Sequence, residues 1–290
     1  METVEQIPLT VQTDLGHGGR WFSLNGGGRE WLWQRHEPLR DRVTVGDAFV
    51  DAGGLEECVP TVRGTPDHGD AWTRIWTALD EYAHEHVVQC AEFELTRHIS
   101  VHEGAVIADY RLAADPGYRF IWAAHALLDL SPRATLELDQ DTKVRLFTEA
   151  APHLSGPWPD GAAWIEGDWP APAGLRLDTL GPDDGSGVGA VAYRSEAPTP
   201  QDRATALVLD GPDQLRMTVE ADAQPTAIAL WRNLGGFPQP DPYRSIGVEP
   251  MLGRVFDLAD AQDGDCAVTP ATGEVRWRLT ITAFRQTEGN

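Results

Sequence analysis

The stretch EVRWRLTITA, residues 274–283, gives the strongest indication of the fold class. Its apolar positions are Val275, Trp277, Leu279, Ile281 and Ala283, and each is followed or preceded by a charged or hydroxyl-bearing residue. A period of two places alternate side chains on opposite faces of an extended chain, so one face is buried and the other meets water. The pattern predicts a half-buried β-strand close to the C-terminal end.

Similar short runs of apolar and β-branched residues recur along the whole chain, separated by turn residues at intervals of roughly 8 to 12 residues, which is typical of an all-β sandwich or barrel. We expect strands within residues 21–24, 30–33, 87–101, 105–112, 118–130, 134–147, 188–193, 203–209, 215–220 and 227–231. Hairpins are predicted at the glycine-rich residues 25–28 and at residues 103–104. We therefore expect one all-β domain over residues 1–290.

Helical periodicity is weak. The best candidates are residues 72–84 and a turn or two within residues 255–261, and neither is long enough to form a layer. Residues 152–174 are rich in proline and glycine and contain three tryptophans, which favours a long ordered loop over a flexible linker.

Composition excludes several classes of partner. The 290 residues carry a formal net charge of -22 with a pI near 4.6, so the protein's electrostatic field repels nucleic acids and anionic membrane surfaces.

The three cysteines, Cys58, Cys90 and Cys266, have neither zinc-finger nor CxxC spacing, which argues against a disulfide framework or a structural metal. With no apolar leader or membrane-length apolar run, we expect a soluble cytoplasmic protein of unknown oligomeric state.

Residues 53–76, GGLEECVPTVRGTPDHGDAWTRIW, concentrate more polar and aromatic chemistry than a core needs. Their glycine and proline content favours a loop on a rigid scaffold, where binding and catalytic groups commonly lie. His68 stands between Asp67 and Gly69, where a loop histidine can be exposed and titrate near neutral pH.

Two further positions are candidates for acid-base chemistry. His125 lies in the apolar run FIWAAHALLDL, where a buried structural histidine is slightly more common than a catalytic one. Glu249 stands in SIGVEPMLG, where burial would raise the carboxylate pKa and suit a general base, and Pro250 restricts its backbone to an extended form. The alternative is a solvent-facing glutamate on an edge strand.

Several motifs in order along the chain together resemble the aldose 1-epimerase family, the galactose mutarotase-like proteins. They are GGRWFSLNGGGREWLW, GGLEECVPTV, PDHG with a tryptophan eight residues after the histidine, WAAHALLDL and GVEPMLG, followed by the final strand. The resemblance extends over residues 18–284 and implies a β-supersandwich with a sugar bound in an open cleft.

By this resemblance, Glu249 would be the general base at the anomeric hydroxyl, His125 the acid at the ring oxygen, and His68 a residue that orients the sugar. The reaction would interconvert α and β anomers of a neutral aldose without a cofactor. Five residues of the 53–76 stretch could either bind the substrate or have a structural role, namely Trp72, Arg74, Asp67, Glu57 and Trp76. The branch of the family that acts on hexose 6-phosphates has HGxxR, in which the arginine serves the phosphate. This chain has HGDAW, with Trp72 in place of that arginine, which argues against a phosphosugar unless Arg74 substitutes.

Three alternatives stay open at this point. The chain could be a non-catalytic carbohydrate-binding protein, or an enzyme of the same fold recruited to another acid-base reaction on a sugar-like substrate. Alternatively, the two histidines and Glu249 could form a facial triad for a metal ion. His84 and His86 form an HxH pair that could bind a metal. The first carboxylate after the pair, Glu92, is too distant for the usual spacing of a cupin-type metal site.

Overall fold

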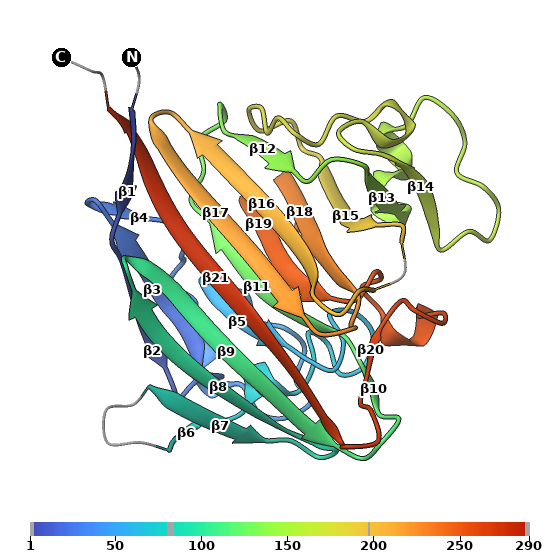
Figure 1. The fold of residues 1–290 in the computed structure, drawn as a ribbon. Helices are drawn as coiled ribbons and strands as arrows, with labels where there is room; N and C mark the ends of the chain where they lie inside the picture. Colours follow the sequence, from blue (N-terminus) through green and yellow to red (C-terminus); the bar gives the residue numbers. More distant parts are fainter. Residues whose placement is uncertain (1–2, 80–83, 197, 288–290) are drawn as a thin grey trace.

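A computed structural model describes residues 3–79, 84–196 and 198–287, and shows two large antiparallel sheets packed face to face (Figure 1). Sheet A contains, in spatial order, β12 (Thr135–Leu138), β16 (Asp202–Asp210), β17 (Asp213–Ala221), β21 (Glu274–Thr287), β9 (Ala105–Ala114), β8 (Phe93–His102), β7 (Glu85–Gln89) and β6 (Thr77–Ala78), with β1 (Thr3–Ile7) paired to β21. The all-β prediction is confirmed.

Sheet B carries the candidate site. Its order is β14 (Trp164–Asp168), β13 (Thr142–Phe147), β15 (Gly187–Arg194), β18 (Thr226–Phe237), β19 (Tyr243–Leu252), β11 (Trp122–Leu128), β5 (Leu55–Cys58), β3 (Arg20–Gly26) and β2 (Leu9–Asp14), with β4 (Arg29–Glu30) paired to β3. A small ribbon joins β10 (Arg119–Phe120) to β20 (Ala267–Val268). The helical elements are the short 3-10 turns η1 (Arg40–Arg42), η2 (Ala71–Thr73), η3 (Thr148–His153), η4 (Pro172–Gly174) and η5 (Leu258–Asp260). Within the described residues, no helix could span a membrane.

The alternating stretch that predicted the fold class forms most of β21, which lies between β17 and β9 in the middle of sheet A (Figure 1). Trp277, Leu279 and Ile281 are buried, whereas Arg276 and Arg278, which flank Trp277, are exposed. The predicted hairpins are also present, β3 with β4 and β8 with β9, and Glu103 and Gly104 both adopt the positive φ angles that so tight a turn requires.

Several segment predictions were wrong. Residues 87–101 divide between β7 and β8, and residues 118–130 divide between β10 and β11. Residues 72–79 form the end of η2 and strand β6 instead of a helix, and this irregular backbone buries both Trp72 and Trp76. Residues 80–83 of the predicted helix lie outside the described part of the chain. Residues 134–147 divide between the two sheets as β12 and β13. Residues 152–174 contain a strand, β14, which pairs along β13 as the edge of sheet B.

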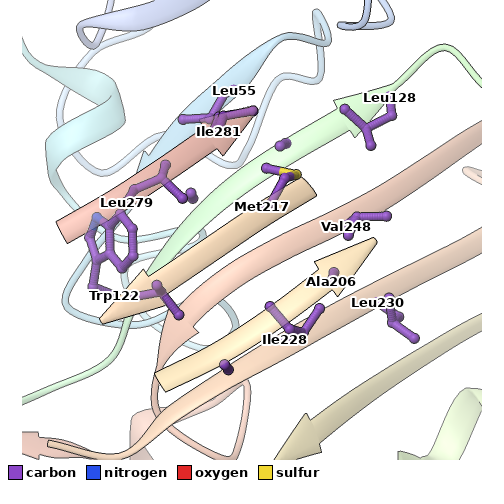
Figure 2. Close-up of a cluster of buried hydrophobic side chains, with 14 of the residues drawn as sticks. Leu55, Trp122, Leu128, Ala206, Met217, Ile228, Leu230, Val248, Leu279 and Ile281 are labelled. Carbon is purple, nitrogen blue, oxygen red and sulfur yellow. The ribbon is translucent and has the colours of Figure 1, made fainter. Parts of the chain in front are cut away.

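The main core lies between the sheets. Figure 2 shows side chains from both, including Leu279, Ile281 and Met217 of sheet A and Trp122, Leu128 and Val248 of sheet B. Because successive side chains on a strand point to opposite faces, residues 123 and 125 of β11 and residues 247 and 249 of β19 are on the other face of sheet B. A second apolar cluster, which includes Ala123, Ala229 and Met251, packs on that outer face.

Candidate active site

A cavity of about 590 Å³ opens on the outer face of sheet B. Its floor is formed by β11, β18 and β19, which contribute His125, Leu127, Trp231, Ser245 and Glu249. Loop segments form the walls: residues 35–51 before β5, residues 62–68 after it, and residues 237–241 between β18 and β19. The cavity therefore combines a rigid, hydrogen-bonded floor with loop-borne polar groups, the arrangement that is common in binding sites.

His125 and Glu249 lie side by side on neighbouring strands. The β11–β19 register pairs Ala123 with Met251 and Leu127 with Gly247, so His125 is level with Glu249. Nε2 of His125 is 3.8 Å from Oε1 of Glu249. Cross-strand neighbours on one face of an antiparallel pair are this close by construction, so the fold brings together two groups 124 positions apart in sequence.

Burial shifts the pKa values of both groups in opposite directions. It raises the pKa of Glu249, against the lowering effects of His125 and Arg63, and the side chain is only 2% exposed. It lowers the pKa of His125, partly offset by the Glu249 charge. Desolvation disfavours the charged form of each group, so the free energies of the ionised and neutral pairs approach one another. Such a pair can both take and give a proton.

His68 reaches the same cavity from the loop after β5. Its backbone has a φ of 56°, and Nδ1 lies 2.8 Å from Oδ1 of Asp67. The ring stacks on Phe49, with centroids 3.7 Å apart, and meets the His125 ring edge to face at 5.1 Å. Asp67 also accepts a hydrogen bond from the backbone N–H of Phe49 through Oδ2. Although burial raises the pKa of Asp67, these hydrogen bonds lower it below its usual value. Asp67 thus ties His68 to the 35–51 wall.

The structure places four of the five predicted substrate-binding residues away from this cavity, and we correct those assignments. Glu57 points to the opposite face of β5, between the sheets, where Arg97, Tyr110 and Trp122 donate hydrogen bonds to it. Trp72 is fully buried, and its indole N–H donates to the backbone oxygen of Asp67.

Trp76 and Arg74 are the other two. Trp76 is buried, and Cζ of the Arg97 guanidinium lies 4.6 Å from the centroid of the Trp76 ring. Arg74 makes a bidentate ion pair with Asp70 and lines a separate surface groove. Asp67 is the predicted binding residue that lines the cavity, although both of its carboxylate oxygens already accept hydrogen bonds.

Sequence reasoning missed several cavity residues. Phe49 contacts both histidines, and Tyr243 donates a hydrogen bond to Asp51 while Trp33 stacks on its ring. Arg63 lies over the Phe256 ring and forms an ion pair with Glu149. Only Arg63 falls inside the 53–76 stretch, and the others stand in segments with no distinctive spacing.

The described residues contain no group of three or more His, Cys, Asp or Glu side chains arranged to hold a metal ion. Of the HxH pair, His86 is buried on β7, where its Nδ1 lies 3.3 Å from Nη2 of Arg97. The facial-triad hypothesis thus finds no support in the arrangement of these side chains.

No known family profile matches the chain, and neither does any curated protein sequence. Solved structures do resemble it. A candidate aldose 1-epimerase of Escherichia coli K12 aligns over 98% of this chain and 99% of its own, with a TM-score of 0.64 and 12% identity. A galactose mutarotase related enzyme of Lactobacillus acidophilus aligns over 99% and 98%, with a TM-score of 0.62 and 13% identity.

A galactose mutarotase-like protein of Lactobacillus casei aligns over 98% of this chain and all of its own, with a TM-score of 0.59 and 15% identity. At such identities, the likeness concerns the backbone architecture and not the chemistry. The likeness extends over nearly the whole chain in all three cases. The chain therefore has the galactose mutarotase-like β-supersandwich fold.

Proposed function

We propose that the protein is an aldose 1-epimerase-like isomerase, which interconverts the α and β anomers of a neutral aldose by general acid-base catalysis. The observation that carries the proposal is the state of the Glu249 carboxylate. Within the described part of the chain, its Oε2 is the only carboxylate oxygen that is buried without a hydrogen-bond partner. A buried acceptor without a partner costs free energy unless a ligand or a proton satisfies it. A sugar hydroxyl entering the cavity would supply that donor.

In the proposed reaction, Glu249 removes the proton from the anomeric hydroxyl while the bond between C1 and the ring oxygen breaks. The electrons of the O–H bond form the C1 carbonyl, and the ring oxygen takes a proton from His125. Rotation about the C1–C2 bond then presents the other carbonyl face to the ring hydroxyl. Closure returns both protons and yields the opposite anomer.

The pair geometry suits this exchange. Glu249 and His125 together hold one proton before and after each turnover, and with Oε1 and Nε2 3.8 Å apart, substrate oxygens that lie beside the pair can reach both groups. His68, held by Asp67 and Phe49, would accept a hydrogen bond from a sugar hydroxyl at Nε2 when its Nδ1–H donates to Asp67. A positioned acid or base contributes roughly 10²- to 10⁴-fold each, which suffices for a reaction that already proceeds in water.

Charge in the cavity favours a neutral sugar. Its lining includes five carboxylates, on Glu37, Asp51, Asp67, Asp241 and Glu249, against two arginines. Both arginines are paired, Arg35 with Glu37 at 3.5 Å and Arg63 with Glu149. Arg74, the residue that could have replaced the missing phosphate-binding arginine, is held by Asp70 outside the cavity. A phosphate group would therefore meet net repulsion.

The test is the rate at which fresh α-glucose and α-galactose reach anomeric equilibrium, followed by polarimetry or NMR. We expect the wild type to accelerate at least one of them and Glu249→Gln to lose roughly 10²-fold or more of that acceleration. Glu94→Gln, which removes a surface carboxylate bonded to Arg111, is the matched control and should retain full activity. Binding of sugar without acceleration by the wild type would refute catalysis and identify a carbohydrate-binding protein instead.

A further inference from the structure

Gly247 occupies an unusual place for a glycine. It lies in the interior of β19, paired with Leu127 of β11 on one side and Trp231 of β18 on the other. Glycine weakens strand interiors, and there it often marks a close approach of another group. The backbone of Gly247 does not have a positive φ, so its conformation does not call for glycine. The reason must lie in the space above its Cα atom.

That space is filled by Glu249. Residues 247 and 249 point to the same face of the strand, and the glutamate side chain folds back along β19. A methyl carbon added to Gly247 would overlap Oε1 of Glu249 and lie 3.2 Å from its Cδ and 3.0 Å from Cβ of Trp231. Of these, the carboxylate is the part that could move, because Trp231 is fixed in the neighbouring strand.

We propose that Gly247 is a positioning residue: its missing side chain forms the slot that holds the Glu249 carboxylate level with His125. Three walls define this slot, Leu127, Trp231 and the backbone of β19. With Oε1 lodged there, Nε2 of His125 is 3.8 Å away and Oε2 has no partner. A side chain at position 247 would push the carboxylate out of the slot and change both relations.

Gly189 provides an internal comparison on the same face of sheet B, since it pairs with Trp231 from the opposite side. A methyl carbon there would lie 2.5 Å from Oε1 of Glu149 and 2.6 Å from Nη2 of Arg63, and would not meet Glu249 among its nearest atoms. Each glycine thus accommodates a different carboxylate. A substitution at Gly189 should disturb the Arg63–Glu149 ion pair and leave the Glu249 slot intact.

The decisive experiment is a double-mutant cycle on stability, which needs no substrate. Gly247→Ala is made in the wild type and in Glu249→Ala, where the carboxylate is absent, and each variant is unfolded in urea. We expect Gly247→Ala to raise the unfolding equilibrium constant about tenfold more in the wild type than in Glu249→Ala, within the range of coupling between contacting residues. Gly156→Ala, where a methyl group meets no atom within 4 Å, should show no coupling.

Gly189→Ala is the second control, and its cost should be the same with or without Glu249. If Gly247→Ala prevents folding in the wild type but not in Glu249→Ala, the proposal is supported equally. Equal costs in the two backgrounds, or failure to fold in both, would overturn it and assign the glycine to packing against Trp231.

The catalytic consequence rests on the proposed function. If the wild type accelerates anomerisation, Gly247→Ala should lower kcat about 10²-fold with KM changed less than threefold, because misplacing a catalytic group affects the transition state more than binding. An unchanged kcat would contradict the positioning role. Coupling in the stability cycle together with an inactive wild type would support the slot and refute the proposed reaction, so the two failures are distinguishable.

Discussion

Replacement of Glu57 by alanine tests whether this residue is part of the core, as the structure shows, or part of a sugar site. Arg97 Nη1 and the Tyr110 hydroxyl donate to Oε1, at 2.7 and 2.9 Å, and Trp122 Nε1 donates to Oε2 at 2.8 Å. The Arg97 and Glu57 side chains have no exposed surface. Their ion pair joins sheet A to sheet B through the middle of the core.

The expected cost follows from what Glu57→Ala leaves behind. Breaking a buried ion pair by removing one partner costs about 3–5 kcal/mol, because the other charge stays buried without compensation. The Tyr110 and Trp122 donors would each lose their partner as well, at about 1–3 kcal/mol for a fully buried group. These contributions share one site and do not add, so we expect a loss of at least about 4 kcal/mol, a large fraction of the 5–15 kcal/mol typical of a whole domain.

The assay is urea denaturation followed by tryptophan fluorescence and circular dichroism. Asp109→Ala is the control, since it breaks a partly exposed ion pair with Arg278 on the outside of sheet A and should cost less than about 1 kcal/mol. A loss from Glu57→Ala no greater than that of the control would refute the reasoning. So would unchanged stability combined with weakened sugar binding, which would return Glu57 to the role first predicted from the sequence.

Three further predictions concern the cavity. Because burial raises the pKa of Glu249 above its ordinary value of 4.5, the folded state binds more protons than the unfolded state just above that pH. The free energy of unfolding of the wild type, measured relative to Glu249→Gln, should therefore decline as the pH rises above 4.5, and a constant difference would contradict this. Asp67→Asn should lower kcat roughly tenfold or more by weakening the His68 hydrogen bond, worth about 1.5–3 kcal/mol, and an unchanged kcat in anomerisation kinetics would show that His68 needs no such support. Glucose 6-phosphate should react at least about tenfold less efficiently than glucose at low salt, with the gap narrowing as salt is added, and equal efficiency would refute the charge argument.

The sequence predicted those parts of the fold that depend on local patterns. The alternation in residues 274–283 depends on one strand alone, so β21 could be recognised without knowing its neighbours. Residues 134–147 show the limit of such patterns, because they are predicted as one strand but form β12 and β13, which lie in different sheets on either side of the polar residues 139–141. The polar residues mark where the stretch divides, but only the packing of the two sheets decides that its two parts join different sheets.

The candidate site was predictable only in part, for the same reason. His125 and Glu249 could be selected as residues, but their adjacency depends on β11 and β19 being neighbours in sheet B. One open interpretation placed Glu249 on an edge strand facing solvent, whereas β19 lies inside the sheet between β18 and β11 and buries the carboxylate. Strand order is a tertiary property, and no local spacing encodes it.

Glu56 and Glu57 show how the choice between faces decides chemistry. The register pairs His125 with Glu56, so Glu56 is on the cavity face and Glu57 points into the core. On that face Glu56, His125 and Glu249 form a row across three adjacent strands. Two glutamates thus flank one histidine, and a local sequence pattern could not rank them.

Their partners separate them. Burial raises the pKa of Glu56 to about 7 despite Arg40, whose guanidinium bonds both carboxylate oxygens at 2.9 and 3.0 Å. Glu249 is equally buried, but no arginine bonds it, and one of its oxygens has no partner. The Arg40 guanidinium binds both oxygens of Glu56 and balances its charge, whereas the unpartnered oxygen of Glu249 can take a substrate proton. The same residue type therefore has a structural role on one side of His125 and, in the proposed mechanism, the chemical role on the other.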